Sequence, residues 1–500
     1  MSRKQQRIVR TIAIVLAILL AGSAIISAII SLAYAEEAAP TANEMTLTME
    51  YLGEAQALRT SQRLVYTNDS NRALDRVIFY VPSNLFRRQS SLPYDGEHLI
   101  DAFPSGYLPG GADLTGVWVD GEAADYGFQG ENEMYLRVAC NLAPGESCTF
   151  EFDYYLLLTE NEAFLGVSED GWRLSGFYFA PASLDDAGEF LLNLPLAFTE
   201  YADCPPMNVR ASIALPNSFL LAATGVETCE SGEDRVNHWT ITADGVRDFA
   251  VAFGRRYREY AREASGVTLR CLTNVRRVAD DVLAVATGAV AACEAWFGPF
   301  PYAQLDIVQT DTAEDPLCHT ACLWLSEGLM RDSDARDHAI RVFVAQQYFG
   351  RRTGGRPSSD AWLSDAVSEY LGYLLLEEAE GHDAYLAALN KNLVSSLQLT
   401  IPGGLNVTSD ASLFTQDEYQ IVVRNRGAAV FHELRTAMGR EGLIDGLRIF
   451  YEKGLDGSVL TEMDLVGALD EASGGSWEAF LTDWVFNIGD YVNQNIDWLD

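Results

Sequence analysis

The hydrophobic pattern of the chain changes near residue 260, and this change constrains the fold more than any other feature. Before it, short apolar stretches alternate with polar turns, which indicates strands. Examples are residues 63–66, 77–81, 149–158 and 209–215. We therefore predict an antiparallel β-sandwich over residues 45–257.

After the change, apolar residues recur at intervals of three and four, which indicates helices. The clearest examples are residues 275–296, 335–349, 361–376 and 427–438, with a short strand at 305–309 among them. We predict a second, mostly α-helical α+β domain over residues 265–500. The chain is then multidomain, and its 48% apolar residues suffice for two sizeable cores.

The apolar stretch near the N-terminus predicts that the protein is exported. Residues 11–35 carry no charge, and 12–32 are nearly all apolar, which is long enough to cross a bilayer. Basic residues precede this stretch and acidic residues follow it, so residues 1–10 are predicted to form a cytoplasmic basic tail. We predict a transmembrane anchor at 11–34, with the bulk of a single-pass membrane protein outside the cytoplasm. Ala33-Tyr34-Ala35 also fits a cleavage site, so a long signal peptide and a secreted protein form the alternative.

The charge balance excludes one class of partner. The chain has 71 acidic and 35 basic residues, a net charge of −36. Such a surface repels phosphate backbones, so we expect no nucleic acid partner. The predicted partners are the membrane, through the N-terminal segment, and a peptide or an envelope protein.

All eight cysteines lie beyond the apolar N-terminal segment. An oxidising compartment favours disulfides. Short separations suggest the pairs Cys140–Cys148, Cys204–Cys229, Cys271–Cys293 and Cys318–Cys322. The run Cys318-His319-x-x-Cys322 also has spacing that fits a metal, and this alternative is disfavoured for an exported chain.

Familiar catalytic motifs are absent from the sequence. It contains no Gly-x-x-x-x-Gly-Lys phosphate loop and no Gly-x-Ser-x-Gly elbow. None of its six histidines has another histidine four residues away. His432-Glu433 is half of a zinc peptidase motif, and without a second imidazole we interpret His432 as an ordinary helix residue.

Several segments nevertheless resemble one family in its own order. They read LVYTNDSNRALDRVIFYVPSNLF (64–86), NVRASIALPNSFLLAATG (208–225), VRDFAVAF (246–253), FGPFPYAQLDIV (297–308), QQYFG (346–350) and WLSDAVSEY (362–370). The chain resembles the membrane alanyl aminopeptidase-like family of gluzincin zinc metallopeptidases. The resemblance implies that the helical half is a thermolysin-like peptidase domain and that zinc is the family cofactor.

The resemblance also implies where the catalytic residues should lie. Active members carry His-Glu-x-x-His, with the second His running into Gln-Trp-Phe-Gly, then eighteen intervening residues and a Glu. Gln347-Tyr348-Phe349-Gly350 matches the second motif, which places Val342, Phe343 and Gln346 at the His, Glu and His positions. The same separation, residues 347–364, places Asp365 at the third ligand. The resemblance therefore implies a degenerate member.

Two further family positions are changed. The Glu that binds the substrate amine corresponds to Cys318, and the transition-state Tyr corresponds to Arg424. A competing alignment makes Glu327 the third ligand, because Trp324-Leu325-Ser326-Glu327-Gly328 resembles the family's Trp-Leu-x-Glu-Gly. That alignment would put the His motif at residues 304–308, which contain no histidine.

These replacements predict the loss of the zinc chemistry. A catalytic zinc site needs three protein ligands and a water, and Val and Phe side chains donate nothing. We therefore expect no cofactor and no catalytic residue, and predict an exported pseudopeptidase that binds a peptide or protein. One alternative is a hydrolase with another metal site, built from Asp365, Glu369, Asp311, Glu314 and Asp315 as oxygen donors for a hard cation. Another is a purely structural envelope protein.

Overall fold

The structure is a computed structural model. It describes residues 43–492 except 95, 131, 170, 186, 194–195, 197, 199–203, 234, 314–315, 395, 397–400 and 402–403. The predicted tail at 1–10 and the predicted membrane segment at 11–34 lie outside the described residues. Within the described part, no helix has both the length and the apolarity needed to cross a membrane.

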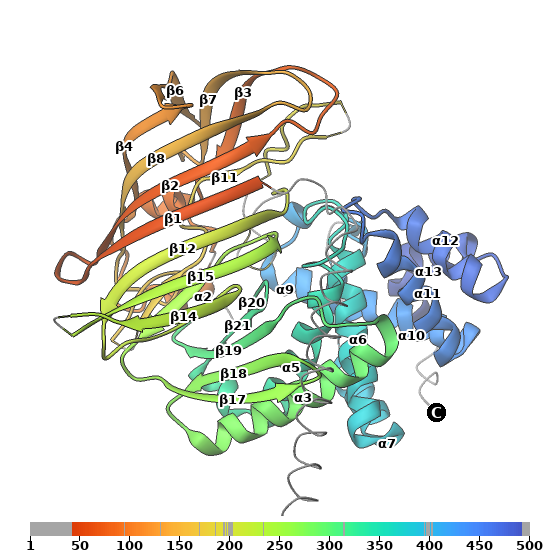
Figure 1. Cartoon of the computed structure of the whole chain (residues 1–500). Coiled ribbons are helices and arrows are strands. Elements are labelled where there is room, and N and C mark those ends of the chain that lie inside the picture. Colours follow the sequence, from red (N-terminus) through yellow and green to blue (C-terminus); the bar gives the residue numbers. More distant parts are fainter. Residues whose placement is uncertain are drawn as a thin grey trace, which may run out of the picture. The chain divides into compact units, whose positions relative to one another are not determined.

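The N-terminal half contains one large sheet of eight strands, in the order β14–β15–β12–β1–β2–β8–β4–β5 (Figure 1). The strands are β1 (Asn43–Leu52), β2 (Ala57–Thr67), β4 (Gly111–Val119), β5 (Glu122–Ala123), β8 (Ser147–Leu157), β12 (Met207–Pro216), β14 (Val226–Ser231) and β15 (Val236–Val246). Neighbours are antiparallel except β1 and β12, which are parallel. Along β1, Met45, Leu47 and Met49 are buried while the residues between them are exposed, so one face of the sheet packs on the core.

Two four-stranded sheets complete the sandwich and share its hydrophobic core. One, in the order β11–β3–β7–β6, contains β3 (Leu74–Tyr80), β6 (Tyr126–Gln129), β7 (Tyr135–Leu142) and β11 (Ala180–Pro181). The other, in the order β13–β16–β10–β9, contains β9 (Leu165–Val167), β10 (Gly171–Leu174), β13 (Leu220–Ala223) and β16 (Val251–Gly254). Phe79 and Phe152 contact one another across the core, with a distance of 5.0 Å between their ring centroids. The predicted β-sandwich is confirmed, with one parallel pair that its alternating pattern does not reveal.

The C-terminal half combines a five-stranded sheet with helices. The sheet, in the order β17–β18–β19–β21–β20, contains β17 (Arg258–Ala264), β18 (Val267–Thr273), β19 (Gln304–Thr310), β20 (Leu317–His319) and β21 (Cys322–Ser326). The α-helices are α3 (Arg276–Phe297), α4 (Glu327–Arg331), α5 (Ser333–Tyr348), α6 (Trp362–Glu380), α7 (His382–Leu389), α9 (Gln416–Tyr419), α10 (Gly427–Met438), α11 (Arg440–Lys453), α12 (Glu462–Ser473) and α13 (Glu478–Val492). The helix α2 (Gly96–Ala102) lies in the N-terminal half, and a π-helix, η7 (Gln420–Arg426), joins α9 to α10. The four predicted helices and the predicted strand are confirmed to within a few residues.

The remaining short helical segments are η1 (Gly53–Ala55), η2 (Pro82–Arg87), η3 (Gln89–Ser91), η4 (Asn390–Val394) and η6 (Ala411–Leu413).

The five-stranded sheet separates two hydrophobic cores. In β21, Leu323 and Leu325 belong to the core of the helices, whereas Cys322 and Trp324 belong to the core of the sandwich. Successive strand residues point to opposite faces, so β18, β19 and β21 each contribute to both cores, whereas the edge strand β17 is mostly exposed. The sheet is therefore a shared layer that fixes the helical half against the sandwich within this compact unit.

A glycine sets the separation of α5 and α6. A Cβ on Gly372 would lie 2.6 Å from Cγ2 of Val342 and 3.2 Å from Cε1 of His338. Because Gly372 has no side chain, α5 and α6 approach closely at this point, which is where the family site is expected. Gly350, with a φ of +124°, turns the chain at the end of α5.

Candidate functional site

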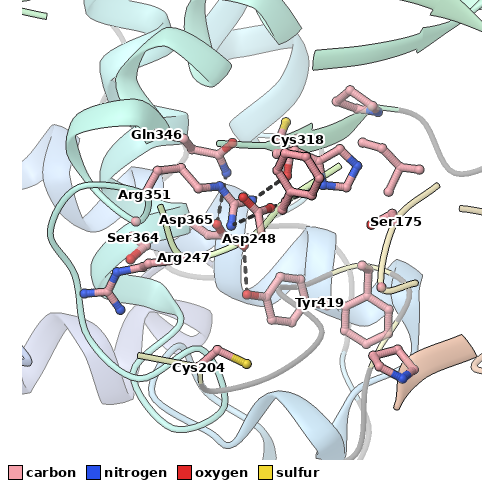
Figure 2. A pocket seen from close by; sticks show the side chains of 18 of the residues that line it. Ser175, Cys204, Arg247, Asp248, Cys318, Gln346, Arg351, Ser364, Asp365 and Tyr419 are labelled. Carbon is pink, nitrogen blue, oxygen red and sulfur yellow. Dashed lines mark hydrogen bonds and ion pairs between the residues drawn. The ribbon is translucent and has the colours of Figure 1, made fainter. Parts of the chain in front are cut away.

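A cavity of about 270 Å³ lies between the sandwich and the helical half (Figure 2). The sandwich supplies Tyr80, Tyr178 and the loop between β15 and β16, while β20, α5, α6 and η7 supply the other side. Polar residues that line the cavity form two groups. We call Gln346, Asp365, Tyr419 and Arg424 the helical wall, and Arg247, Asp248 and His319 the sheet wall.

Asp365 is the centre of the helical wall, and three side chains hold it. Its Oδ1 accepts a hydrogen bond from Nε2 of Gln346 at 3.1 Å, and its Oδ2 accepts one from the Tyr419 hydroxyl at 2.9 Å. Nε of Arg424 donates to the same Oδ2 at 3.3 Å. Burial alone would lower the pKa of Arg424, but the Asp365 carboxylate outweighs it and raises the pKa. Both carboxylate oxygens are thus engaged by donors of the chain itself.

The other predicted zinc positions offer no donor atom to this wall. Val342 lies on α5 and lines a neighbouring chamber, and Phe343 is fully buried in the core of the helical half. Within the residues that the structure describes, no group of three His, Cys, Asp or Glu side chains could hold a metal ion. The guanidinium of Arg424 already neutralises the one carboxylate at these positions. The residues present therefore do not fit the zinc ion that the resemblance implies.

Asp248 is the centre of the sheet wall. Its Oδ1 accepts the backbone N–H of Thr320 at 2.8 Å, and Oδ2 lies 3.3 Å from Nδ1 of His319 and 3.8 Å from Nη1 of Arg351. Burial alone would raise the pKa of Asp248, but Arg351 and the His319 hydrogen bond outweigh it and hold the pKa well below its usual value. The carboxylate is therefore ionised at neutral pH.

Two polar groups of the sheet wall have no partner among the described residues. Nε2 of His319 is buried and makes no hydrogen bond, although the residue lines the cavity and is only 2% exposed. The buried Nε of Arg247 makes none either, and its guanidinium forms no ion pair with a described residue (Figure 2). Of this wall, only His319 was predicted from the sequence as a candidate, as part of the run Cys318-His319-x-x-Cys322, and Arg247 and Asp248 were not. A signal was present, since Arg247-Asp248 is a charged pair inside the apolar segment 246–253.

Cys318, which the resemblance places at the family's amine-binding position, lines the cavity as a protonated thiol, because burial raises its pKa to about 12. The paired strands show why it cannot join Cys322. Cys318 pairs with Leu323 and packs toward the helical core, whereas Cys322 pairs with His319 and belongs to the sandwich core. The two sulfur atoms lie on opposite faces of the hairpin, which also argues against the metal alternative for these residues.

None of the four predicted disulfides is formed in the structure. Cys271 and Cys293 are fully buried, and burial raises the pKa of Cys271 to about 12. Cys229 is exposed on β14, and Cys204 lines the cavity. The thiols of Cys140 and Cys148 share a hydrogen bond, which lowers the pKa of Cys140 and raises that of Cys148.

A second chamber of about 860 Å³ lies beside the cavity, and Gln346, Cys318 and Arg424 line both. One helical turn from Val342 and Asp365, Nε2 of His338 lies 2.7 Å from Oε1 of Glu369. Burial alone would raise the pKa of Glu369, but His338 and Arg424 outweigh it and keep the pKa low. The Glu369 carboxylate is engaged by His338, so it is not available as an oxygen ligand for a hard cation.

The remaining predicted positions are separated in the fold. Asp311 accepts a hydrogen bond from Ser168 at 2.7 Å and lines neither chamber, while Glu314 and Asp315 lie outside the described residues. The alignment through Glu327 would place a helical His motif on residues 304–308, which fall in strand β19. His432 is buried on α10 with Nδ1 2.7 Å from the Tyr385 hydroxyl, as expected of a core histidine.

Comparisons with known proteins support the architecture. No known protein family and no curated protein matches the sequence. Among solved structures, an M1 zinc metallopeptidase variant from Deinococcus radiodurans aligns with a TM-score of 0.61 and 17% identity over 89% of this chain and 93% of that one. A structure of the same protein is described as bound to a Tyr-Ser-Ala substrate, with a TM-score of 0.60, 17% identity and the same coverage.

Aminopeptidase A from Legionella pneumophila, described in complex with aspartic acid, aligns with a TM-score of 0.65 and 14% identity over 89% of this chain and 49% of that chain. At these identities the likeness shows the fold alone. The chain has the M1 aminopeptidase architecture, a β-rich domain followed by a mostly helical one.

Proposed function

We propose that the chain is a pseudopeptidase, a degenerate protein of the aminopeptidase fold that binds a peptide or a protein segment without cleaving it. The observation that carries the proposal is the state of Asp365. It stands at the third ligand position, and Gln346, Tyr419 and Arg424 occupy both of its oxygens. A positive guanidinium therefore stands where the family resemblance expects a cation.

Hydrolysis also needs a general base and a polarising group, and the corresponding positions hold none. Phe343 replaces the glutamate and is buried in the core. Arg424 replaces the tyrosine and is committed to Asp365. Because the effects of residues that act as a unit are not additive, restoring one of them would not restore turnover.

The cavity retains the properties of a peptide site. Aromatic side chains line it, including Tyr178, Phe198, Phe249 and Tyr419. Two buried polar atoms, Oε1 of Gln346 and Nε2 of His319, have no partner among the described residues and could form hydrogen bonds with the backbone of a peptide. The tripeptide complex described for the Deinococcus protein supports the same class of ligand here.

The test combines turnover and binding on the purified full-length protein in detergent. With added Zn²⁺ and aminoacyl reporter substrates we expect no chelator-sensitive turnover, and its appearance would overturn the proposal. A fluorescent peptide library should give saturable binding. Gln416→Trp, which fills the cavity, should weaken that binding about tenfold, equivalent to about 1.4 kcal/mol. Gln129→Trp, exposed on β6, is the matched control. Saturable binding that Gln416→Trp leaves unchanged would place the ligand elsewhere.

Export and membrane anchoring belong to the same proposal and rest on the sequence. The uncharged stretch 11–35 and the basic residues before it support an anchor with the bulk outside the cytoplasm. The alternative is a cleaved signal and a secreted protein. Sequencing the mature N-terminus distinguishes these two, and fractionation of cells tests both.

A further inference from the structure

Among the described residues, the cavity is lined by equal numbers of carboxylates and guanidinium groups, and these differ in how fully they are paired. The carboxylates are Asp248, Asp365 and Asp417. The chain's own donors engage the first two. Asp417 is exposed at the start of α9, where water solvates it. The described walls therefore present no buried, unengaged carboxylate to a ligand's ammonium group.

Among the guanidinium groups, Arg247 stands apart. Arg424 is committed to Asp365, and Arg351 donates to the backbone oxygen of Cys318 and lies near Asp248. Arg247 makes no hydrogen bond or ion pair with any described residue, and its Nε is buried. A partly buried guanidinium without an anion is costly unless a ligand supplies one. The chain has 71 acidic and only 35 basic residues, so a guanidinium in a cavity without an acidic partner among the described residues is unusual for it.

His319 adds a second requirement on the ligand. Since Asp248 is ionised, Nδ1 of His319 carries the proton that the carboxylate accepts. The buried Nε2 of His319 has no partner among the described residues. The buried Oε1 of Gln346, which also lines the cavity, is an acceptor without a partner among the described residues. This oxygen suits an amide N–H group near the bound anion.

We propose that the cavity recognises a peptide by a carboxylate, with Arg247 as the group that binds it, and does not recognise a free amine. This inference rests on the proposed function and names its ligand class. The family resemblance implies recognition of a substrate amine by a Glu, and Cys318, a neutral thiol, stands at that position. Charge selectivity of the cavity would thus be opposite to that of an aminopeptidase.

Three capped forms of one dipeptide test the inference on the purified full-length protein by calorimetry. Acetyl-Ala-Phe carries only the carboxylate, Ala-Phe amide only the amine, and acetyl-Ala-Phe amide neither. We expect acetyl-Ala-Phe to bind about tenfold more tightly than the others, the effect of one charge-assisted hydrogen bond. Arg247→Met should abolish this preference and Arg247→Lys should retain part of it. Arg262→Met, exposed on β17 outside the cavity, should leave the preference unchanged.

The outcomes separate this inference from the proposed function. Tighter binding of the amine form, or equal binding of all three forms, would overturn carboxylate recognition and leave a peptide-binding cavity standing. A preference for acetyl-Ala-Phe that survives Arg247→Met would overturn the assignment to Arg247. Failure of all three probes, together with the failure of the peptide library, would overturn the proposed function and this inference with it.

Discussion

The two walls of the cavity are built from the same kinds of side chain and differ in how completely those side chains are paired. In the helical wall, Asp365 accepts three hydrogen bonds and Arg424 is neutralised by it. In the sheet wall, Asp248 is equally well held, yet the adjacent Arg247 and the far nitrogen of His319 have no partner among the described residues. The charges of the helical wall form an internal ion pair, and only a neutral atom there, Oε1 of Gln346, lacks a partner among the described residues, whereas the sheet wall leaves a charged guanidinium for a ligand.

This difference separates structural from binding roles. An ion pair with both partners satisfied fixes its own geometry, and removing one partner leaves an uncompensated buried charge. A group without a partner contributes little to the folded state, so its removal should cost little. Variants of the ion pair in the helical wall should therefore mainly lower stability, whereas variants of the unpaired groups in the sheet wall should mainly weaken binding.

The largest effect is expected for Asp365→Leu. The side chains of Asp365 and Arg424 are only 15% and 20% exposed, so the variant leaves a mostly buried guanidinium without its anion. We expect a loss of about 3 kcal/mol in the free energy of unfolding, measured by urea denaturation. Replacing both partners, as Asp365→Leu with Arg424→Met, should cost less than Asp365→Leu alone.

Asp417→Leu is the matched control, because this exposed carboxylate lines the same cavity. We expect it to change stability by less than about 0.5 kcal/mol. If the two single variants had equal effects, the helical wall would not be the tightly paired group that its geometry indicates.

Between about pH 7 and pH 5, the pH dependence of stability should arise outside both walls, at His432, because the lowered pKa of Asp248 affects stability only at lower pH. Burial lowers the pKa of His432 to about 4, from an ordinary value near 6.5. Between these values the unfolded chain binds a proton that the native ring refuses, so stability falls as the pH is lowered from about 7 to about 4. The contribution is at most about 3 kcal/mol.

Urea denaturation of the wild type and His432→Phe at several pH values measures it. The variant should be less stable at pH 7 but show a shallower decline toward pH 5. If the unfolding free energy of the variant declined with pH as steeply as that of the wild type, another group would be responsible for the pH dependence. The stabilities of the wall variants would then have to be compared at a single pH.

A smaller effect is expected for His319→Phe. The variant removes the Nδ1–H that donates to Asp248 and keeps a ring against Trp324, whose centroid lies 4.6 Å away. Asp248 retains the N–H of Thr320 and the nearby Arg351, so we expect a loss of about 1 kcal/mol. Thermal unfolding beside His238→Phe, which is exposed on β15, measures the difference. A loss as large as that of Asp365→Leu would show that the sheet wall also depends on one partner.

The sequence was sufficient for the architecture because its patterns are local. Alternation predicts the sandwich strands, and spacings of three and four predict α3, α5, α6 and α10. Only one of the five strands of the shared sheet was predicted, at 305–309. β18 and β21 are buried on both faces, so they lack the polar alternation that marks a strand with one solvated face. β17 is an edge strand and is mostly exposed, and β20 has only three residues.

The site was predictable only in part. Counting along the motif places Gln346 and Asp365 together, and the structure joins them at 3.1 Å. The donation from Arg424 depends on how η7 packs against α6, which no local pattern encodes. The opposite faces of Cys318 and Cys322 depend on the register of a hairpin, and sequence separation alone does not provide it.

The smallest expected effect on stability belongs to Arg247→Met, and it tests the comparison most directly. Arg424→Met would leave the Asp365 carboxylate without its ion-pair partner. Arg247 forms no ion pair with a carboxylate of the described residues, so Arg247→Met has no such effect. Methionine keeps most of the aliphatic stem and removes a partly buried charge that no anion balances. We expect a change of less than about 0.5 kcal/mol in the free energy of unfolding, measured beside Arg424→Met. A loss comparable to that of Arg424→Met would mean that Arg247 has a structural partner, and the sheet wall could then no longer be distinguished from the helical wall by its unpaired charge.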